Sequence, residues 1–209
     1  MNVAFIPARY GSKGLKNKNT LNFNGKPLIA WSIEVALNCD KIDKIIVSTD
    51  SDQIAKIATE YGASVDIRPK YLATDHAKTI DVVHEYISRN SKIDNIIVLQ
   101  PTSPIRSNYL LKDCIQKFLK SSNSNLATGY YCKNIEFGSH NNMRRQDFNG
   151  FFYDDGSIYI LPKELVLAKK WNGDNPLKYI NKKIYTYEID DFVDFKILEF
   201  LIANQNEFK

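Results

Sequence analysis

FIPARYGSKGLKNKN, residues Phe5–Asn19, joins an apolar run to a loop with two glycines and four cationic side chains. Glycine permits positive φ and close approach of the backbone to a ligand, and successive N–H groups in such a loop form a concave anion site. Arg9, Lys13, Lys16 and Lys18 add positive charge around it. The stretch therefore predicts a buried strand followed by a polyphosphate-binding loop.

This loop differs from two common phosphate motifs, because it contains neither G-x-x-x-x-G-K-[ST] nor G-x-G-x-x-G. A basic surface turn is the alternative, since most lysine clusters are solvated. The strand before the loop and the helical pattern after it favour the phosphate site.

Outward from this stretch, short apolar runs alternate with helical patterns. The predicted strands are Val3–Pro7, Lys44–Asp50, Ala63–Arg68, Asn95–Gln100, Leu126–Tyr131, Ser157–Leu161 and Ile184–Ile189. The predicted helices are Pro27–Asn38, Asp52–Tyr61, Thr79–Asn90, Leu110–Leu119 and Val193–Asn204. The repeated β-α-β order predicts an α/β fold with a doubly wound, mostly parallel sheet.

Three loops of unusual composition each follow a predicted strand: Ala8–Asn19, Ser48–Ser51 and Gln100–Arg106. In open α/β sheets, ligands bind outside the carboxyl ends of the strands. The loop Gln100–Arg106, QPTSPIR, is stiffened by two prolines and offers side-chain donors suited to substrate recognition, although proline turns are often structural. We expect the three loops to share one site.

Composition narrows the function classes. The 209 residues suit a single domain, 1–209, and a net charge of +4, concentrated in the first 26 residues, favours a small anionic ligand over a nucleic acid. Cys39, Cys114 and Cys132 form neither a disulfide framework nor a zinc pattern, which indicates a reducing compartment. Met1 lies almost directly before the first strand, and no apolar run approaches membrane-spanning length. We therefore expect a cytoplasmic protein without a membrane partner.

An acidic segment near the C-terminus, Tyr185–Phe195 (YTYEIDDFVDF), is a candidate metal site. Glu188 and Asp190 are two residues apart at the end of a predicted strand, so both carboxylates face one side. The alternative is an acidic start to the last helix, where Asp191 or Asp194 complements the helix dipole. Asp50, within Ser48–Asp52, fits a helix-capping run better than a metal site.

The segment Lys133–Asp155 is polar, aromatic and irregular, and it contains Arg144 and Arg145. Its composition is compatible with a flexible excursion, a lid or an oligomerisation arm.

Six motifs now coincide in order along the chain: Ile6-Pro-Ala-Arg-x-Gly-Ser-Lys-Gly-Leu-x-x-Lys-Asn19, Gly25–Leu28, Ser48–Ser51, Arg68-Pro-x-x-Leu-Ala73, Leu99–Pro104 and Arg144–Gln146. Together they resemble the acylneuraminate cytidylyltransferases, the CMP-sialic acid synthetases and their relatives for other nonulosonic acids. The resemblance implies a nucleotide-diphospho-sugar transferase (Rossmann-like) fold with a small dimerisation arm. It also implies transfer of CMP from CTP to the anomeric hydroxyl of a nonulosonic acid, with release of pyrophosphate, by a Mg²⁺-dependent homodimer.

The resemblance also assigns residues. Lys18, Arg9 and Lys13 are the expected catalytic residues, and Lys18 neutralises charge that develops on the α-phosphate. The expected nucleotide site comprises Ala8, Arg9, Ser12, Lys13, Lys18, Asn19, Arg68, Ala77 and Thr79, of which the last three read the cytosine edge. The expected sugar site comprises Gln100, Thr102, Ser103, Arg144 and Arg145. Glu188 and Asp190 are the expected magnesium ligands.

Three departures from the family pattern bear on this assignment. Residues Ala8–Tyr10 resemble the Ala-Arg-Tyr of the KDO cytidylyltransferases, which makes a sugar nucleotidyltransferase for KDO, or for a neutral sugar 1-phosphate, the second candidate. Glu188 stands where the family has aspartate, and Lys133–Asp155 is shorter than the family's dimerisation segment. A non-catalytic nucleotide-binding relative is a further alternative, and a glycosyltransferase with Asp50-Ser51-Asp52 as its D-x-D motif is disfavoured because Asp52 falls at a helix start.

Overall fold

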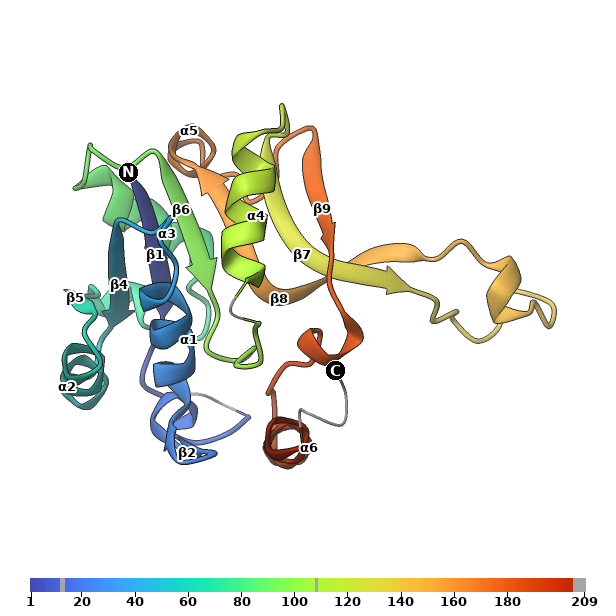
Figure 1. Cartoon of the computed structure of the whole chain (residues 1–209), viewed down its shortest axis with the longest axis horizontal. Helices are drawn as coiled ribbons and strands as arrows, with labels where there is room; N and C mark the ends of the chain where they lie inside the picture. The colour runs from blue at the N-terminus through green and yellow to red at the C-terminus, as the bar shows by residue number, and fades with distance from the viewer. Residues whose placement is uncertain (12–13, 108, 205–209) are drawn as a thin grey trace.

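The computed structural model describes residues 1–11, 14–107 and 109–204 and contains a mixed seven-stranded sheet (Figure 1). The strand order is β5-β4-β1-β6-β8-β7-β9. These strands are β1 (Asn2–Pro7), β4 (Lys44–Thr49), β5 (Ser64–Ile67), β6 (Asn95–Leu99), β7 (Asn125–Cys132), β8 (Phe151–Pro162) and β9 (Pro176–Ile180). The strands β2 (Asn22–Phe23) and β3 (Lys26–Pro27) form a separate small hairpin.

The sheet is parallel except at one strand. β5, β4, β1 and β6 run parallel to one another, β8 is antiparallel to both β6 and β7, and β9 is parallel to β7. The prediction of a mostly parallel α/β sheet is therefore confirmed.

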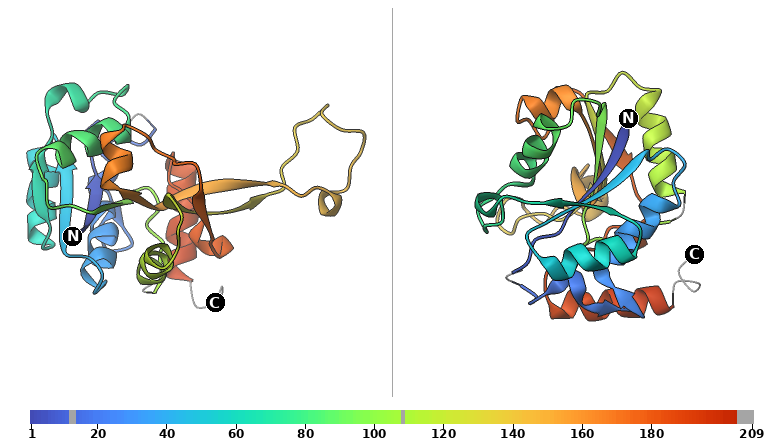
Figure 2. Two further views of the ribbon diagram at one scale, coloured as in Figure 1. Left: turned by 90° about the horizontal axis from the view of Figure 1, so that it is seen from above. Right: turned by 90° about the vertical axis from the view of Figure 1, so that its left-hand side faces the viewer.

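Helices cover both faces of the sheet (Figure 2). They are α1 (Leu28–Leu37), α2 (Asp52–Glu60), α3 (Thr79–Ser88), α4 (Leu110–Leu119), α5 (Lys163–Leu167) and α6 (Phe192–Ala203). Alternation along β1 explains the two layers: Ala4 and Ile6 pack with α1, α2 and α4, whereas Val3 and Phe5 pack with α3 and α5. A third apolar cluster packs α6 against α1 and the hairpin.

Local signals set several helix ends. Ser51 caps α2 by accepting a hydrogen bond from the backbone N–H of Ile54, and Gly62 takes a positive φ of 87° just after the helix. Asp191 and Asp194 form a capping box at the start of α6. The helix-capping interpretation of these acidic residues is thus the one that the structure shows.

One predicted strand is wrong. Ile184–Ile189 is not a strand: Lys183–Tyr185 is a 3-10 turn, and the backbone N–H of Ile189 donates to the carbonyl of Thr102 at 2.8 Å. The last strand is instead β9, Pro176–Ile180, which the sequence analysis missed. Glu188 and Asp190 therefore lie on an irregular segment that is held against the Gln100–Arg106 loop.

The strands β7 and β8 continue beyond the body of the protein as a two-stranded arm (Figures 1 and 2). β8 is longer than predicted, because it begins at Phe151 within the segment expected to be irregular. Residues 133–150 connect the two strands at the tip and contain a 3-10 turn at Arg145–Asp147. Within the described ranges, no helix combines the length and the apolar character needed to cross a membrane.

Candidate active site

The loop after β1 is fixed by contacts to β4 and to itself. The backbone N–H of Tyr10 donates to Asp50 Oδ1 at 2.8 Å, and Asn19 Nδ2 donates to the carbonyl of Arg9 at 3.0 Å. Arg9 donates to the carbonyl of Gly11 at 2.7 Å and pairs with Asp75 Oδ1 at 2.6 Å. Ala8 is buried at the start of this loop. Ser12 and Lys13, both predicted to bind the nucleotide, lie outside the described residues.

Lys18 connects the cationic loop to the acidic segment. Its Nζ donates to the carbonyl of Ile189 at 2.6 Å, and the residue is only 8% exposed. Burial lowers the pKa of Lys18, while the nearby carboxylates of Asp190, Asp194 and Glu188 act in the opposite direction. The structure thus brings the predicted catalytic lysine and the predicted metal ligands together, across a sequence separation of about 170 residues.

Two glycines make this approach possible. A Cβ atom on Gly14 would lie 2.2 Å from the carbonyl oxygen of Asp190, and one on Gly156 would lie 2.6 Å from Glu188 Oε2. Gly156 also has a positive φ of 64°. Both sides of the acidic segment therefore require a residue without a side chain.

Glu188 sits in an unusually acidic environment. Burial, followed by the charges of Asp190, Asp155 and Asp154, raises the pKa of Glu188 to about 7. Asp190 is exposed, whereas Asp191 and Asp194 are engaged in capping α6.

The carboxylates of Glu188 and Asp190 fit Mg²⁺, which binds partly through water and substrate, better than they fit a metal whose ligands all come from the protein. In the part of the chain that the structure describes, no group of three or more His, Cys, Asp or Glu side chains is arranged to hold a metal ion. Magnesium commonly binds through one or two carboxylates, with water and substrate phosphates as its other ligands. The carboxylate pair Glu188 and Asp190 beside the cationic loop suits that mode of binding.

Arg68 follows β5 and is buried, with 6% of its surface exposed. Its guanidinium donates to the carbonyl of Ser48 at 3.0 Å, to Ser48 Oγ at 3.4 Å and to the carbonyl of Leu72 at 3.4 Å. Burial lowers the pKa of Arg68, and the charges of Asp50 and Asp66 oppose this change. A guanidinium has five N–H groups, so these three hydrogen bonds leave donors for a ligand.

Two of the predicted site residues, Thr79 and Gln100, line a cavity of about 330 Å³. It brings Thr79, at the start of α3, together with Gln100, Tyr159 and Trp171. Ala77 lies just before α3, and its N–H donates to the carbonyl of Thr74 at 3.2 Å. The cavity thus joins a residue predicted to bind the nucleotide to one predicted to bind the sugar.

The other residues of the Gln100–Arg106 loop face the protein interior. Ser103 is fully buried and donates to the carbonyl of Asp155 at 3.3 Å. Thr102 Oγ1 is buried and has no hydrogen-bond partner among the described residues. In this conformation, therefore, Gln100 faces the cavity, whereas Thr102 and Ser103 build the loop beneath it.

Arg106, a candidate recognition donor in the sequence, instead ties this loop to the sheet. Its guanidinium donates to the carbonyls of Ser157 and Gln100, both at 2.8 Å, and to Ser32 Oγ at 3.1 Å. Burial lowers the pKa of Arg106 to about 10. Its donors are used within the protein, which makes Arg106 a structural residue.

Sequence reasoning missed two acidic residues of β8, Asp154 and Asp155, which lie near Glu188. Asp155 is buried and accepts hydrogen bonds from Thr128 Oγ1 at 2.6 Å and Asn181 Nδ2 at 2.9 Å. Asp154 accepts from the hydroxyl of Tyr159 at 2.9 Å. The Asp-Asp-Gly triplet at 154–156 was the available signal, but nothing local connects it to Glu188.

Arg144 and Arg145 lie on the arm, which projects away from the body (Figure 1). Both are exposed, and Arg144 pairs with Asp147 at 2.8 Å. Within one chain the structure does not bring them to Gln100 or Glu188.

Comparison with solved structures supports the α/β fold. The fold matches the structure of CMP:2-keto-3-deoxy-manno-octonic acid synthetase complexed with CTP with a TM-score of 0.77 and 16% identity, over 98% of this chain and 99% of that chain. The family model described as Cytidylyltransferase matches residues 3–198, so this chain belongs to the cytidylyltransferase family. The resemblance found in the motifs is confirmed at that level.

Two curated relatives show how far the similarity extends. The CMP-N,N'-diacetyllegionaminic acid synthase of Legionella pneumophila is 33% identical over 98% of this chain and 97% of that protein. The N-acylneuraminate cytidylyltransferase of Escherichia coli is 32% identical over 93% of this chain but only 50% of that protein. The chain therefore spans nearly the whole Legionella protein but only about half the length of the first N-acylneuraminate cytidylyltransferases that it matches, including one from Streptococcus agalactiae of which it covers 48%.

Proposed function

We propose that this protein transfers CMP from CTP to the anomeric hydroxyl of a nonulosonic acid, such as N-acetylneuraminate or legionaminate, and releases pyrophosphate. The observation that carries this proposal is the contact of Lys18 Nζ with the carbonyl of Ile189, between Glu188 and Asp190. It places the cationic loop beside a carboxylate pair. The names of the relatives, an N-acylneuraminate cytidylyltransferase and a CMP-legionaminic acid synthase, support the substrate class.

In the proposed reaction the sugar hydroxyl oxygen forms a bond to the α-phosphorus of CTP. The bond from that phosphorus to the bridging oxygen of pyrophosphate breaks, and the hydroxyl proton is released. Arg9, Lys13 and Lys18 neutralise the phosphate charge, and Lys18 acts on the charge that develops in the transition state. Ser12 and Asn19 would hold the triphosphate with them, and Ala8 would belong to the same nucleotide site.

Glu188 and Asp190 would hold Mg²⁺ together with the phosphates of CTP. The ion would supply electrostatic stabilisation of the α-phosphate and help to activate the sugar hydroxyl. Burial and, after it, the neighbouring carboxylates raise the pKa of Glu188 to about 7, and a cation bound beside Glu188 and Asp190 would stabilise the ionised form of Glu188 against both effects.

The sugar acid would bind at Gln100, which lines the cavity, with Thr102 and Ser103 holding the loop beneath it and Arg144 and Arg145 supplied by the arm of a second copy. The projecting arm and its exposed apolar side chains, among them Phe137 and Met143, support a homodimer. We place the reaction in the cytoplasm because the three cysteines are free thiols.

KDO is the second candidate acceptor. Two observations favour it: the fold matches the structure of CMP:2-keto-3-deoxy-manno-octonic acid (CMP-KDO) synthetase with a TM-score of 0.77, and Tyr10 follows Ala8 and Arg9. The Ser-Lys-Gly-Leu sequence at residues 12–15 argues for a nonulosonic acid instead.

The test is pyrophosphate release with CTP and Mg²⁺ across N-acetylneuraminate, legionaminate, pseudaminate and KDO. Turnover with one nonulosonic acid and none with KDO supports the proposal, and turnover with KDO alone selects the second candidate. No turnover with any acid, despite CTP binding, would favour a non-catalytic nucleotide-binding relative.

A further inference from the structure

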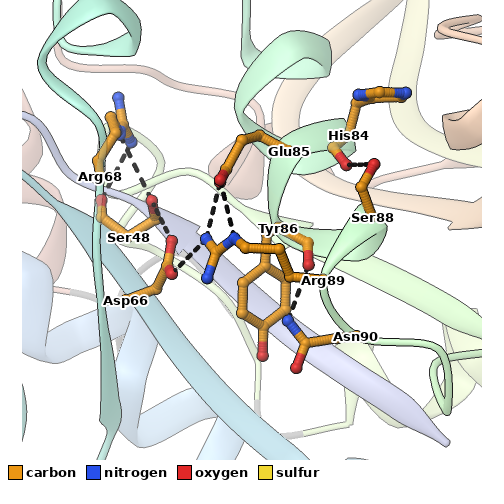
Figure 3. A network of polar contacts seen from close by, with 9 residues as sticks. All are labelled: Ser48, Asp66, Arg68, His84, Glu85, Tyr86, Ser88, Arg89 and Asn90. Atoms are coloured by element: carbon orange, nitrogen blue, oxygen red, sulfur yellow. Dashed lines mark hydrogen bonds and ion pairs between the residues drawn. The ribbon is translucent and has the colours of Figure 1, made fainter.

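A polar network lies behind Arg68 and links β4, β5 and α3 (Figure 3). Asp66, on β5, has a side chain that is only 8% exposed. Its Oδ2 accepts a hydrogen bond from Ser48 Oγ at 3.1 Å, and its Oδ1 accepts one from Arg89 Nη2 at 2.9 Å. Arg89 is held in turn by two hydrogen bonds to Glu85, at 2.8 and 2.7 Å.

The charge of Asp66 fixes which groups of this network donate hydrogen bonds and which accept them. An ionised carboxylate only accepts hydrogen bonds, so Asp66 directs the hydroxyl proton of Ser48 toward itself. The lone pairs of Ser48 Oγ then face Arg68, whose Nε donates to that oxygen at 3.4 Å. The orientation of Arg68 is therefore tied to the charge on Asp66, and the position of Asp66 to Arg89.

The same serine also contacts the phosphate-binding loop. The carbonyl of Ser48 accepts from the backbone N–H of Ala8 at 2.9 Å and from Arg68 Nη2 at 3.0 Å. Ser48 is fully buried at the carboxyl end of β4. One residue thus anchors both the start of the first loop and the arginine assigned to the base.

We propose that Asp66 and Arg89 are positioning residues that fix the guanidinium of Arg68 through Ser48 and thereby set the preference for cytosine over uracil. The proposal rests on the proposed function, in which Arg68 reads the base of CTP. Cytosine presents an acceptor at N3, whereas uracil presents an N–H there. A guanidinium N–H fixed at that edge therefore discriminates between the two bases, and one free to rotate loses the discrimination.

Asp66→Asn is the decisive variant, because asparagine keeps the shape of the side chain. The carboxamide has one acceptor oxygen and one NH₂ group, so it cannot accept from both Ser48 and Arg89. With the NH₂ toward Arg89 that contact is lost, and with the NH₂ toward Ser48 the serine hydroxyl becomes an acceptor there and its proton is no longer directed away from Arg68. We expect the ratio of CTP to UTP affinity, measured by calorimetry, to fall about tenfold. Asp40→Asn is the matched control, since Asp40 forms a surface ion pair with Lys112 at 2.9 Å and should leave the ratio unchanged.

Ser48→Ala supplies an independent variant, since it removes the relay and keeps the backbone carbonyl. Its effect on the CTP to UTP ratio should match that of Asp66→Asn, and the double variant should be no worse than either single one. An unchanged ratio in Asp66→Asn, even with a lower melting temperature, would mean that the network only stabilises the fold and would overturn the proposal. Full additivity in the double variant would also overturn it.

Nucleotide binding tests this inference, whereas pyrophosphate release tests the proposed function, so the two can fail separately. If the wild-type protein prefers CTP to UTP but releases no pyrophosphate with any sugar acid, the proposed function fails while the binding ratio still tests the role of Asp66. If the wild-type protein binds both nucleotides equally, the positioning role is wrong whatever the turnover.

Discussion

At the scale of single residues, Lys18 is the side chain on which the proposed chemistry depends most. It is buried among three carboxylates, which oppose the effect of burial on its pKa and favour its charged form. We expect Lys18→Met, which keeps the apolar stem, to lower kcat about 10²- to 10³-fold, as the loss of one transition-state donor does in other enzymes. Pyrophosphate release measures this effect, and circular dichroism checks the fold. A near-normal kcat in a folded variant would rule out the assigned role.

The acidic segment offers a second test with an internal control. We expect Asp190→Asn and Glu188→Gln each to raise the Mg²⁺ concentration needed for half-maximal rate about tenfold or more, because each removes a charged ligand. Asp191→Asn should leave this concentration unchanged, because Asp191 caps α6 and asparagine is also a good cap. Equal Mg²⁺ titrations for all three variants would remove Glu188 and Asp190 as ligands.

At the scale of elements, the Gln100–Arg106 loop depends on one buried cation. Arg106→Met should lower the free energy of unfolding by about 2–4 kcal/mol, because the carbonyls of Ser157 and Gln100 and the hydroxyl of Ser32 lose their donor. Urea unfolding measures the loss. Lys112→Met on the surface of α4 is the comparison and should change stability little. A loss no larger than that of Lys112→Met would contradict the structural role of Arg106.

Elements set by local pattern could be predicted from the sequence. The helix predicted at Leu110–Leu119 has these bounds in the structure, and the strand Val3–Pro7 matches β1 to within one residue. β9 was missed because it is a short strand at the edge of the sheet. Ile184–Ile189 has strand-like composition, but the backbone N–H of Ile189 donates to the carbonyl of the distant Thr102 instead of to a neighbouring strand.

The candidate site likewise contains residues that a local pattern predicts and residues whose role depends on distant contacts. The cationic loop and the pair Glu188 and Asp190 were predictable because their residue types are concentrated in short stretches. Asp155 and the internal role of Arg106 were not, because their hydrogen bonds join segments 26 and 51 residues apart. Asp154 was not, because its charge acts on the distant Glu188. Sequence alone thus identifies the charged groups but not the buried network that supports them.

At the scale of the whole molecule, the arm is the feature that one chain does not explain. The strands β7 and β8 leave the body together, and the side chains of Phe137, Met143 and Phe151 are exposed along them and at their tip. Exposed apolar side chains on a projecting hairpin indicate a surface that another molecule covers. We expect a dimer in sedimentation measurements, and a monomer at all accessible concentrations would contradict the proposed assembly.

A dimer in which each arm serves the partner's site makes a sharper prediction. Replacing both Arg144 and Arg145 by Ala should raise KM for the sugar acid about tenfold and leave KM for CTP nearly unchanged, because the arginines would meet only the sugar carboxylate. Equal effects on both substrates would contradict that assignment. The wild-type protein provides the comparison for each titration.

Mixing variants then decides whether the arm acts within one chain or between two. The Arg144→Ala/Arg145→Ala chain has an intact Lys18, and the Lys18→Met chain has an intact arm. Random exchange between equal amounts makes half of the dimers mixed, and each mixed dimer contains one site with both intact parts, so the rate at low sugar acid should recover to about a quarter of the wild-type value. No recovery after exchange, confirmed by co-purification of differently tagged chains, would show that the arm does not complete the partner's site.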